Sequence, residues 1–220
     1  MKLAVLFSGG KDSCLALHKA MEKHEVSFLL SIIPVNKDSF MFHKPDLKLL
    51  KKQAEMLNIK LIIGKSKGQK DKELKDLEKL IKKVKDKIQG IVVGGLASNY
   101  QGDRIKTICK KYNLKFIAPL WNYSPNQLWK ELLDSGFKVI LTKISSEGIP
   151  KEFLGKIIDK KEIEKLKNLS EKYKFRLDFE GGEAETSVLL MPEFKNKINI
   201  EYNIKSDGNY RHFLLINKIK

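Results

Sequence analysis

Short apolar runs recur through the first half of the chain and alternate with charged stretches whose apolar residues fall three and four positions apart. Apolar runs of this kind are typical of strands buried on both faces of a parallel sheet, and the stretches between them are typical of amphipathic helices. Their alternation predicts an α/β fold with a doubly wound parallel sheet. The predicted strands are 3–7, 28–34, 60–63, 90–93 and 115–118, and the predicted helices are 12–23, 46–57, 71–88 and 101–112.

The pattern changes after Pro119, where the second part of the chain begins. Ser124, Pro125 and Gln127 have the spacing of an N-cap, a first-turn proline and a capping-box glutamine. We therefore predict two domains, 1–119 and 120–220, the second being a smaller α/β lobe that ends in an antiparallel hairpin. Its predicted elements are a helix to 135, a strand at 138–144, a helix from Asp159 to 173, and hairpin strands at 198–204 and 210–219 around Asp207-Gly208.

Basic residues outnumber acidic ones, 43 against 27, for a net charge of +16. Almost all of the excess is lysine, because only Arg104, Arg176 and Arg211 are arginines. Sequence-reading proteins favour arginine forks, whereas scattered lysine is also typical of thermophiles and of biased genomes. We therefore do not expect nucleic acid to be the partner.

The cysteines and the lengths of the apolar segments indicate in which cellular compartment the protein is expected. Cys14 and Cys109 form no C-x-x-C pair, so neither a zinc site nor a disulfide framework is expected, and a reducing cytoplasm fits best. The first apolar run is too short for a signal peptide, and no apolar segment is long enough to cross a membrane. We expect a cytoplasmic protein without a membrane partner.

The motif Ser8-Gly9-Gly10-Lys11-Asp12-Ser13 follows the first predicted strand and precedes the first helix. Glycines allow the backbone to approach an anion closely, and a helix start offers unpaired N–H groups with the positive end of the dipole. The serine hydroxyls and Lys11, expected to be a mobile cation, add further donors. A plain strand-to-helix turn capped by Asp12 is the alternative, but ligands of doubly wound sheets bind at this edge, which favours phosphate.

The motif SGGKDS resembles the PP-loop of the ATP pyrophosphatase superfamily, over roughly residues 1–119. This resemblance implies a HUP-like fold and an enzyme that cleaves ATP between the α and β phosphates, with the loop holding pyrophosphate. It implies that Lys11 and Asp12 act in catalysis and that Asp12 binds Mg²⁺. The implied nucleotide-binding residues are Ser8, Gly9, Gly10, Lys11, Asp12 and Ser13.

A second motif, Glu180-Gly181-Gly182-Glu183-Ala184-Glu185-Thr186, gathers three carboxylates around a glycine turn. Like charges at this spacing repel unless they bind a cation or a metal, although a solvated acidic turn is the plain alternative. With Met41-Phe42-His43, Gly94-Gly95-Leu96-Ala97-Ser98, Tyr100-Gln101, Arg104, Pro119-Leu120-Trp121 and Leu154-Gly155, this motif resembles the diphthine–ammonia ligase family over the whole chain.

This family resemblance implies that ATP activates the carboxylate of diphthine, on translation elongation factor 2, for amidation by ammonium. Glu183 and Glu185 are then catalytic and, with Tyr100, Arg104 and Thr186, bind substrate, while His43, Gly94 and Gly95 join the nucleotide site. A plain turn histidine fits His43 equally well on spacing alone. Trp121 or Tyr100 would offer a cation–π face to the trimethylammonium group, although each is more often a core residue.

One position departs from the family pattern, because Lys156 stands where arginine is common and so lacks a bidentate fork. We expect the active site in a cleft between two α/β lobes, and the sequence leaves a homo-oligomer open. A PP-loop enzyme that modifies tRNA is the first alternative, favoured by the charge and opposed by the few arginines and unpaired cysteines. A non-catalytic nucleotide-binding module is the second, but it has little use for the acidic motif.

Overall fold

The computed structural model describes residues 1–34, 46–66, 70–95 and 99–220, with the backbone alone at 70–72 and 99–101. It divides into two compact units, Met1–Asn122 and Tyr123–Lys220, so the division falls three residues beyond Pro119. Each unit has its own sheet. None of the helices in the described residues is both long and apolar enough to span a membrane.

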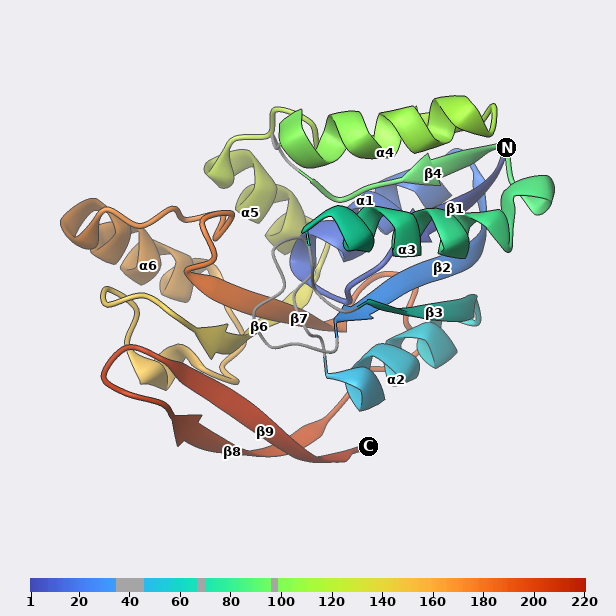
Figure 1. The fold of residues 1–220 in the computed structure, drawn as a ribbon. Coiled ribbons are helices and arrows are strands. Elements are labelled where there is room, and N and C mark those ends of the chain that lie inside the picture. Colours follow the sequence, from blue (N-terminus) through green and yellow to red (C-terminus); the bar gives the residue numbers. More distant parts are fainter. Residues whose placement is uncertain (35–45, 67–69, 96–98) are drawn as a thin grey trace. The chain divides into compact units, whose positions relative to one another are not determined.

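The first unit is built on a five-stranded parallel sheet in the order β3-β2-β1-β4-β5, and Figure 1 shows its strands flanked by helices. The predicted fold class is therefore confirmed for this unit. Its strands are β1 (Lys2–Leu6), β2 (Glu25–Pro34), β3 (Lys60–Ser66), β4 (Gly90–Val92) and β5 (Lys115–Ile117). Its helices are α1 (Lys11–Met21), α2 (Leu47–Leu57), α3 (Lys70–Lys82) and α4 (Asn99–Lys111).

Alternate residues of the central strands pack against different helices. Ala4 of β1 and Leu30 of β2 belong to a core cluster with residues of α3 and α4. Leu3, Val5 and Leu29 are also buried but lie outside that cluster. Side chains of a strand point alternately to the two faces, so the sheet carries a core on each. This double burial explains why the strands read as continuous apolar runs.

The helix predicted at 71–88 is shorter in the structure. It ends at Lys82, and a 3₁₀ turn follows at Lys85–Lys87. The N–H groups of Lys83 and Val84 donate to carbonyls three residues earlier, which tightens the end of the helix. This change of pitch keeps Val84 and Ile88 in the core cluster although the regular helix has ended.

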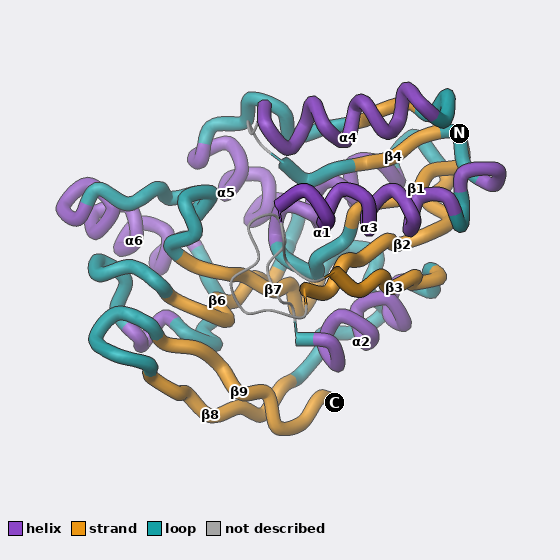
Figure 2. Tube along the Cα trace, viewed as in Figure 1, coloured by secondary structure: helices purple, strands orange, loops and turns teal. Residues whose placement is uncertain are grey.

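The second unit has a four-stranded antiparallel sheet in the order β7-β6-β9-β8. The Ser124 capping box, the Asp159 N-cap and the C-terminal hairpin are confirmed. The strand β7 was not predicted, and it follows a loop after the last helix (Figure 2). The elements are α5 (Pro125–Asp134), β6 (Lys138–Ile144), a 3₁₀ turn (Lys151–Phe153), α6 (Lys160–Tyr173), β7 (Ala184–Leu190), β8 (Ile200–Ser206) and β9 (His212–Ile219).

Candidate active site

The loop from Ser8 to Ser13 connects the carboxyl end of β1 to the start of α1. Gly9 has a φ of 75°, a left-handed conformation that glycine adopts without steric cost. The Ser8 and Ser13 hydroxyl oxygens lie 3.1 Å apart, and the Ser13 hydroxyl also accepts from the Ser8 N–H and donates to the Gly10 carbonyl. The two serines thus brace the loop from inside.

The first turn of α1 suits an anion. Its N-cap, Gly10, makes no side-chain capping hydrogen bond. An α-helix begins with N–H groups that have no partner within the helix, and its dipole is positive at this end. A phosphate group bonded to such N–H groups is a recurrent arrangement in proteins.

Lys11 is the first residue of α1, and its side chain is only 3% exposed. Its Nζ lies 2.9 and 3.0 Å from the two carboxylate oxygens of Asp12. The expectation of a mobile cation was therefore wrong, because burial and this ion pair hold the ammonium group in place. The Asp12 side chain remains 25% exposed, so its carboxylate is accessible to a ligand or a metal ion.

Gly94 and Gly95 follow β4 and differ in their surroundings. A Cβ atom on Gly94 would lie 2.7 Å from the backbone carbon of Asp12 and from the backbone nitrogen of Ser13. A Cβ atom on Gly95 would meet nothing within 4 Å in the part of the chain that the structure describes. Gly94 is therefore needed where the end of β4 meets the start of α1, while Gly95 borders open space beside it.

Gln53 of α2 also contacts the loop, and it is not among the site residues predicted from the sequence. Its side-chain amide nitrogen donates to the Gly9 carbonyl at 2.9 Å, and the residue is 1% exposed. The available signal was a polar residue in the otherwise apolar face of an amphipathic helix, which is too weak to assign a role.

Other residues expected near the nucleotide or substrate are described only in part. His43 lies outside the described residues, and of Tyr100 only the backbone, in α4, is described. Arg104 is half-buried on the same helix. Trp121 already faces a cation of this chain, because the Lys106 Nζ lies 5.3 Å from the centre of its ring.

In the second unit, the acidic motif is divided between a turn and the strand β7, which begins at Ala184. One carboxylate oxygen of Glu183, Oε1, accepts from the Arg176 backbone N–H at 3.0 Å. Its other oxygen, Oε2, is buried and has no hydrogen-bond partner among the described residues. A buried carboxylate oxygen without a partner is costly, so it is a candidate contact for a cation or a donor.

Glu185 differs from Glu183 because its carboxylate forms a direct ion pair with a lysine of this chain. Its Oε1 lies 2.9 Å from the Nζ of Lys143, the residue paired with it on β6. Thr186, the next residue of β7, lies opposite Leu141. For Glu185, the cation that the crowded carboxylates were expected to bind is thus a lysine of this chain.

Lys156 also has a partner within the chain. Its Nζ lies 2.6 Å from Oε1 of Glu162, and Lys165 approaches the same oxygen at 3.1 Å. Hydrogen bonding with Asp159, and then with the two lysines, lowers the pKa of Glu162 to about 2. The Lys156 ammonium group thus belongs to an ion pair within the chain.

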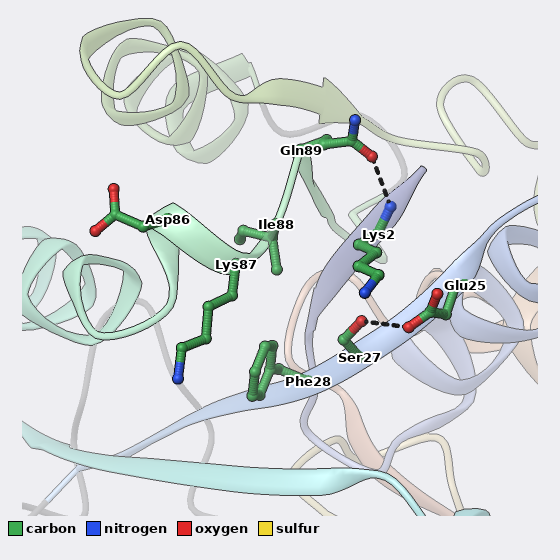
Figure 3. Close-up of a pocket in the computed structure, with 8 residues that line it drawn as sticks. All are labelled: Lys2, Glu25, Ser27, Phe28, Asp86, Lys87, Ile88 and Gln89. Atoms are coloured by element: carbon green, nitrogen blue, oxygen red, sulfur yellow. Dashed lines mark hydrogen bonds between the residues drawn. The ribbon is translucent and has the colours of Figure 1, made fainter.

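A depression of about 730 Å³ lies in the first unit at the amino ends of β1 and β2, the edge of the sheet opposite the loop (Figure 3). The Lys2 backbone N–H donates to Gln89 there, and Ser27 donates to Glu25. Ligands of parallel α/β sheets bind at the carboxyl ends of strands, so we do not assign the reaction to this depression.

The described residues contain no group of three or more His, Cys, Asp or Glu side chains that could hold a metal ion. A metal ion enclosed by protein ligands alone is therefore not provided in this part of the chain. Mg²⁺ commonly binds one or two carboxylates together with phosphate oxygens of a substrate. The accessible carboxylate of Asp12, beside the proposed phosphate site, fits that mode.

Comparisons with known proteins agree with these features. Residues 1–116 match the diphthamide synthase N-terminal domain, and residues 124–220 match the C-terminal domain. The chain is 34% identical to a diphthine–ammonia ligase of Bos taurus and 31% identical to that of Homo sapiens, over 91% of this chain and 83% of each relative.

A solved structure, described as a predicted subunit of tRNA methyltransferase from Methanocaldococcus jannaschii, has a TM-score of 0.47 and 16% identity. The match covers 87% of this chain and 98% of that structure's chain. The two domain matches together cover nearly the whole chain, and the matches to these two relatives cover most of each. The chain therefore belongs to the diphthine–ammonia ligase family of ATP-dependent ligases.

Proposed function

We propose that this protein converts the carboxylate of diphthine, on translation elongation factor 2, to the amide of diphthamide. A carboxylate is a poor electrophile, so it first attacks the α-phosphorus of ATP, which forms an acyl-adenylate and releases pyrophosphate. Ammonia then attacks the activated carbonyl, and AMP leaves. This substrate implies the cytoplasm, where translation elongation takes place.

The observation that carries this proposal is the braced loop from Ser8 to Ser13 at the uncapped start of α1. It offers backbone N–H groups and two hydroxyls where a pair of linked phosphates would lie. We assign the pyrophosphate of ATP to Ser8, Gly9, Gly10 and Ser13. Gly94 allows β4 to approach the loop, and Gly95 and His43 are assigned to the rest of the nucleotide.

Lys11 and Asp12 are assigned the role of stabilising the negative charge that develops on the phosphates during the reaction. The held ammonium group of Lys11 would stabilise negative charge on the leaving pyrophosphate without first having to be ordered. Asp12 would hold Mg²⁺ together with phosphate oxygens. When bound, the ion neutralises charge on the phosphates.

The acidic motif is assigned to the cationic parts of the substrates. Diphthine carries a trimethylammonium group, and ammonium is the nitrogen source. The buried Oε2 of Glu183, which has no hydrogen-bond partner among the described residues, supports a contact with one of these cations. Glu185, whose charge Lys143 compensates, and Thr186 lie on β7 just after Glu183 and are assigned to the same part of the substrate site. Tyr100 and Arg104 remain assigned to the protein substrate.

The test is a reaction of the purified protein with ATP, Mg²⁺, ammonium and diphthine-bearing elongation factor 2. We expect AMP and pyrophosphate in equal amounts, together with the mass change of an acid-to-amide conversion on the factor. Formation of ADP and phosphate would contradict the assigned loop chemistry. AMP formation that depends on tRNA instead of elongation factor 2 would favour a tRNA-modifying enzyme.

A further inference from the structure

Gln53 is the polar exception on the packed face of α2. The other buried residues of this helix are apolar: Leu49, Leu50, Ala54 and Leu57. A primary amide in such a position is costly unless it is hydrogen-bonded. Gln53 is 1% exposed, and its Nε2 donates to the Gly9 carbonyl at 2.9 Å.

The contact between Gln53 and Gly9 is close on both sides. A Cβ atom on Gly9 would lie 2.0 Å from the Oε1 of Gln53, so a larger residue at position 9 would have to displace the Gln53 side chain, and the φ of 75° separately favours glycine. The Gln53 amide thus lies directly against the loop backbone. It donates to the Gly9 carbonyl and occupies the space that a side chain at position 9 would need.

The bond to Gln53 fixes the direction of a whole peptide group. In a trans peptide, the carbonyl of Gly9 and the N–H of Gly10 point in opposite directions. With the carbonyl directed at Gln53, the Gly10 N–H points to the Ser8 hydroxyl, at 3.3 Å. That distance is long for an N–H···O bond, so a phosphate oxygen can replace the hydroxyl at little cost.

We propose that Gln53 is a positioning residue that orients the Gly9–Gly10 peptide so that its N–H faces the pyrophosphate of ATP. This inference rests on the assignment of the loop in the proposed function. Gln53 itself does not touch the nucleotide in this scheme. Its effect should therefore be specific for ligands that occupy the loop.

The test measures binding of inorganic pyrophosphate with Mg²⁺, and separately of AMP, to the whole protein by calorimetry. Gln53→Met removes the donor but keeps the length of the side chain. Leu50→Met places the same residue on the same packed face of α2 and is the matched control. We expect Gln53→Met to weaken pyrophosphate binding about tenfold or more, as a buried carbonyl loses its donor. AMP binding should change less than about twofold.

If Gln53→Met weakened the binding of pyrophosphate and of AMP equally, or left pyrophosphate binding unchanged, the role of Gln53 would be overturned. The control, Leu50→Met, should leave both affinities unchanged. If it weakened pyrophosphate binding as much as Gln53→Met does, that role would also be overturned. Gln53→Glu has nearly the same shape and cannot donate when ionised, so it provides a second test if Gln53→Met does not fold. Wild-type protein that binds AMP but not pyrophosphate would instead contradict the assignment of the loop itself.

Discussion

Gly94 and Ser13 are separated by 80 residues in sequence, yet a Cβ atom on Gly94 would lie 2.7 Å from the Ser13 backbone nitrogen. Real Cβ atoms do not approach backbone so closely. The end of β4 is therefore in contact with the first turn of α1, and it holds that turn beside the carboxyl end of β1. The proposed phosphate site therefore depends on contact between the segment that follows β4 and the start of the helix that follows β1.

Gly94→Ala should move the first turn of α1 and so impair both stability and ATP binding. Backbone cannot yield as a side chain can, and such overpacking typically costs about 1–3 kcal/mol. Gly95→Ala is the matched control, because its Cβ would meet nothing within 4 Å among the described residues. The thermal midpoint of Gly95→Ala should equal that of wild type. A thermal midpoint as low as that of Gly94→Ala would show that the two glycines do not differ as described.

Asp12→Asn should reduce turnover far more than stability. Asparagine keeps an oxygen that can accept from Lys11, but it loses the charge that we assign to Mg²⁺. Removal of such an electrostatic group typically costs on the order of 10²-fold in turnover. Asp103→Asn, at an exposed ion pair with Lys106, is the control and should be nearly silent. Near-full activity of Asp12→Asn at saturating ATP and Mg²⁺ would remove Asp12 from the mechanism.

Much of the fold was predictable because its signals are local. Continuous apolar runs mark strands buried on both faces, and the Ser124 capping box is formed by residues within one helical turn. The loop at Ser8 could be placed at a strand end because parallel sheets bring such ends together at one edge. These predictions needed only neighbouring residues or a rule of topology.

The features that were missed depend on contacts between distant residues. The burial of Lys11 is set by the packing around α1, and the role of Gln53 by its contact with Gly9, 44 positions away. The strand β7 was missed because its first half, Ala184-Glu185-Thr186, is polar and follows two glycines. Its pairing with β6, including Lys143 opposite Glu185, outweighs that local composition.

Binding of tRNA should be weak and should depend little on salt. A protein that neutralises several phosphates releases counterions, so its affinity falls steeply as salt rises. Of 43 basic residues, 25 lie in residues 1–122, against 12 acidic ones, and this unit would supply any such binding. Fluorescence anisotropy with labelled tRNA over a salt series measures the slope. A tight complex that also stimulates AMP formation would favour the tRNA-modifying alternative.

The ion pairs of Glu162 should make the second unit sensitive to acid. Because the pKa of Glu162 falls from 4.5 to about 2 in the folded protein, the unfolded state takes up its proton more readily. Its contribution to stability is complete above about pH 4.5 and is lost as the pH falls to about 2. Glu162→Gln should lower the thermal midpoint at pH 7, and the difference from wild type should shrink below pH 4.5. A difference that stays constant with pH would show that the charge is not responsible.

Glu183 and Glu185 provide a matched pair in the acidic motif, because only Glu185 has a lysine of this chain beside it. Glu183→Gln keeps an oxygen for the Arg176 N–H and removes only the charge. We expect its ATP affinity to stay within a few-fold of wild type, since the loop belongs to the other unit. Its amidation rate should fall about tenfold or more, about 1.4 kcal/mol at the barrier.

Glu185→Gln should have a smaller effect, because Lys143 already compensates that charge. Single-turnover amidation and equilibrium ATP binding measure the two quantities separately. An equal loss of ATP affinity would place Glu183 in the nucleotide site, and unchanged amidation would make the motif an ordinary solvated turn.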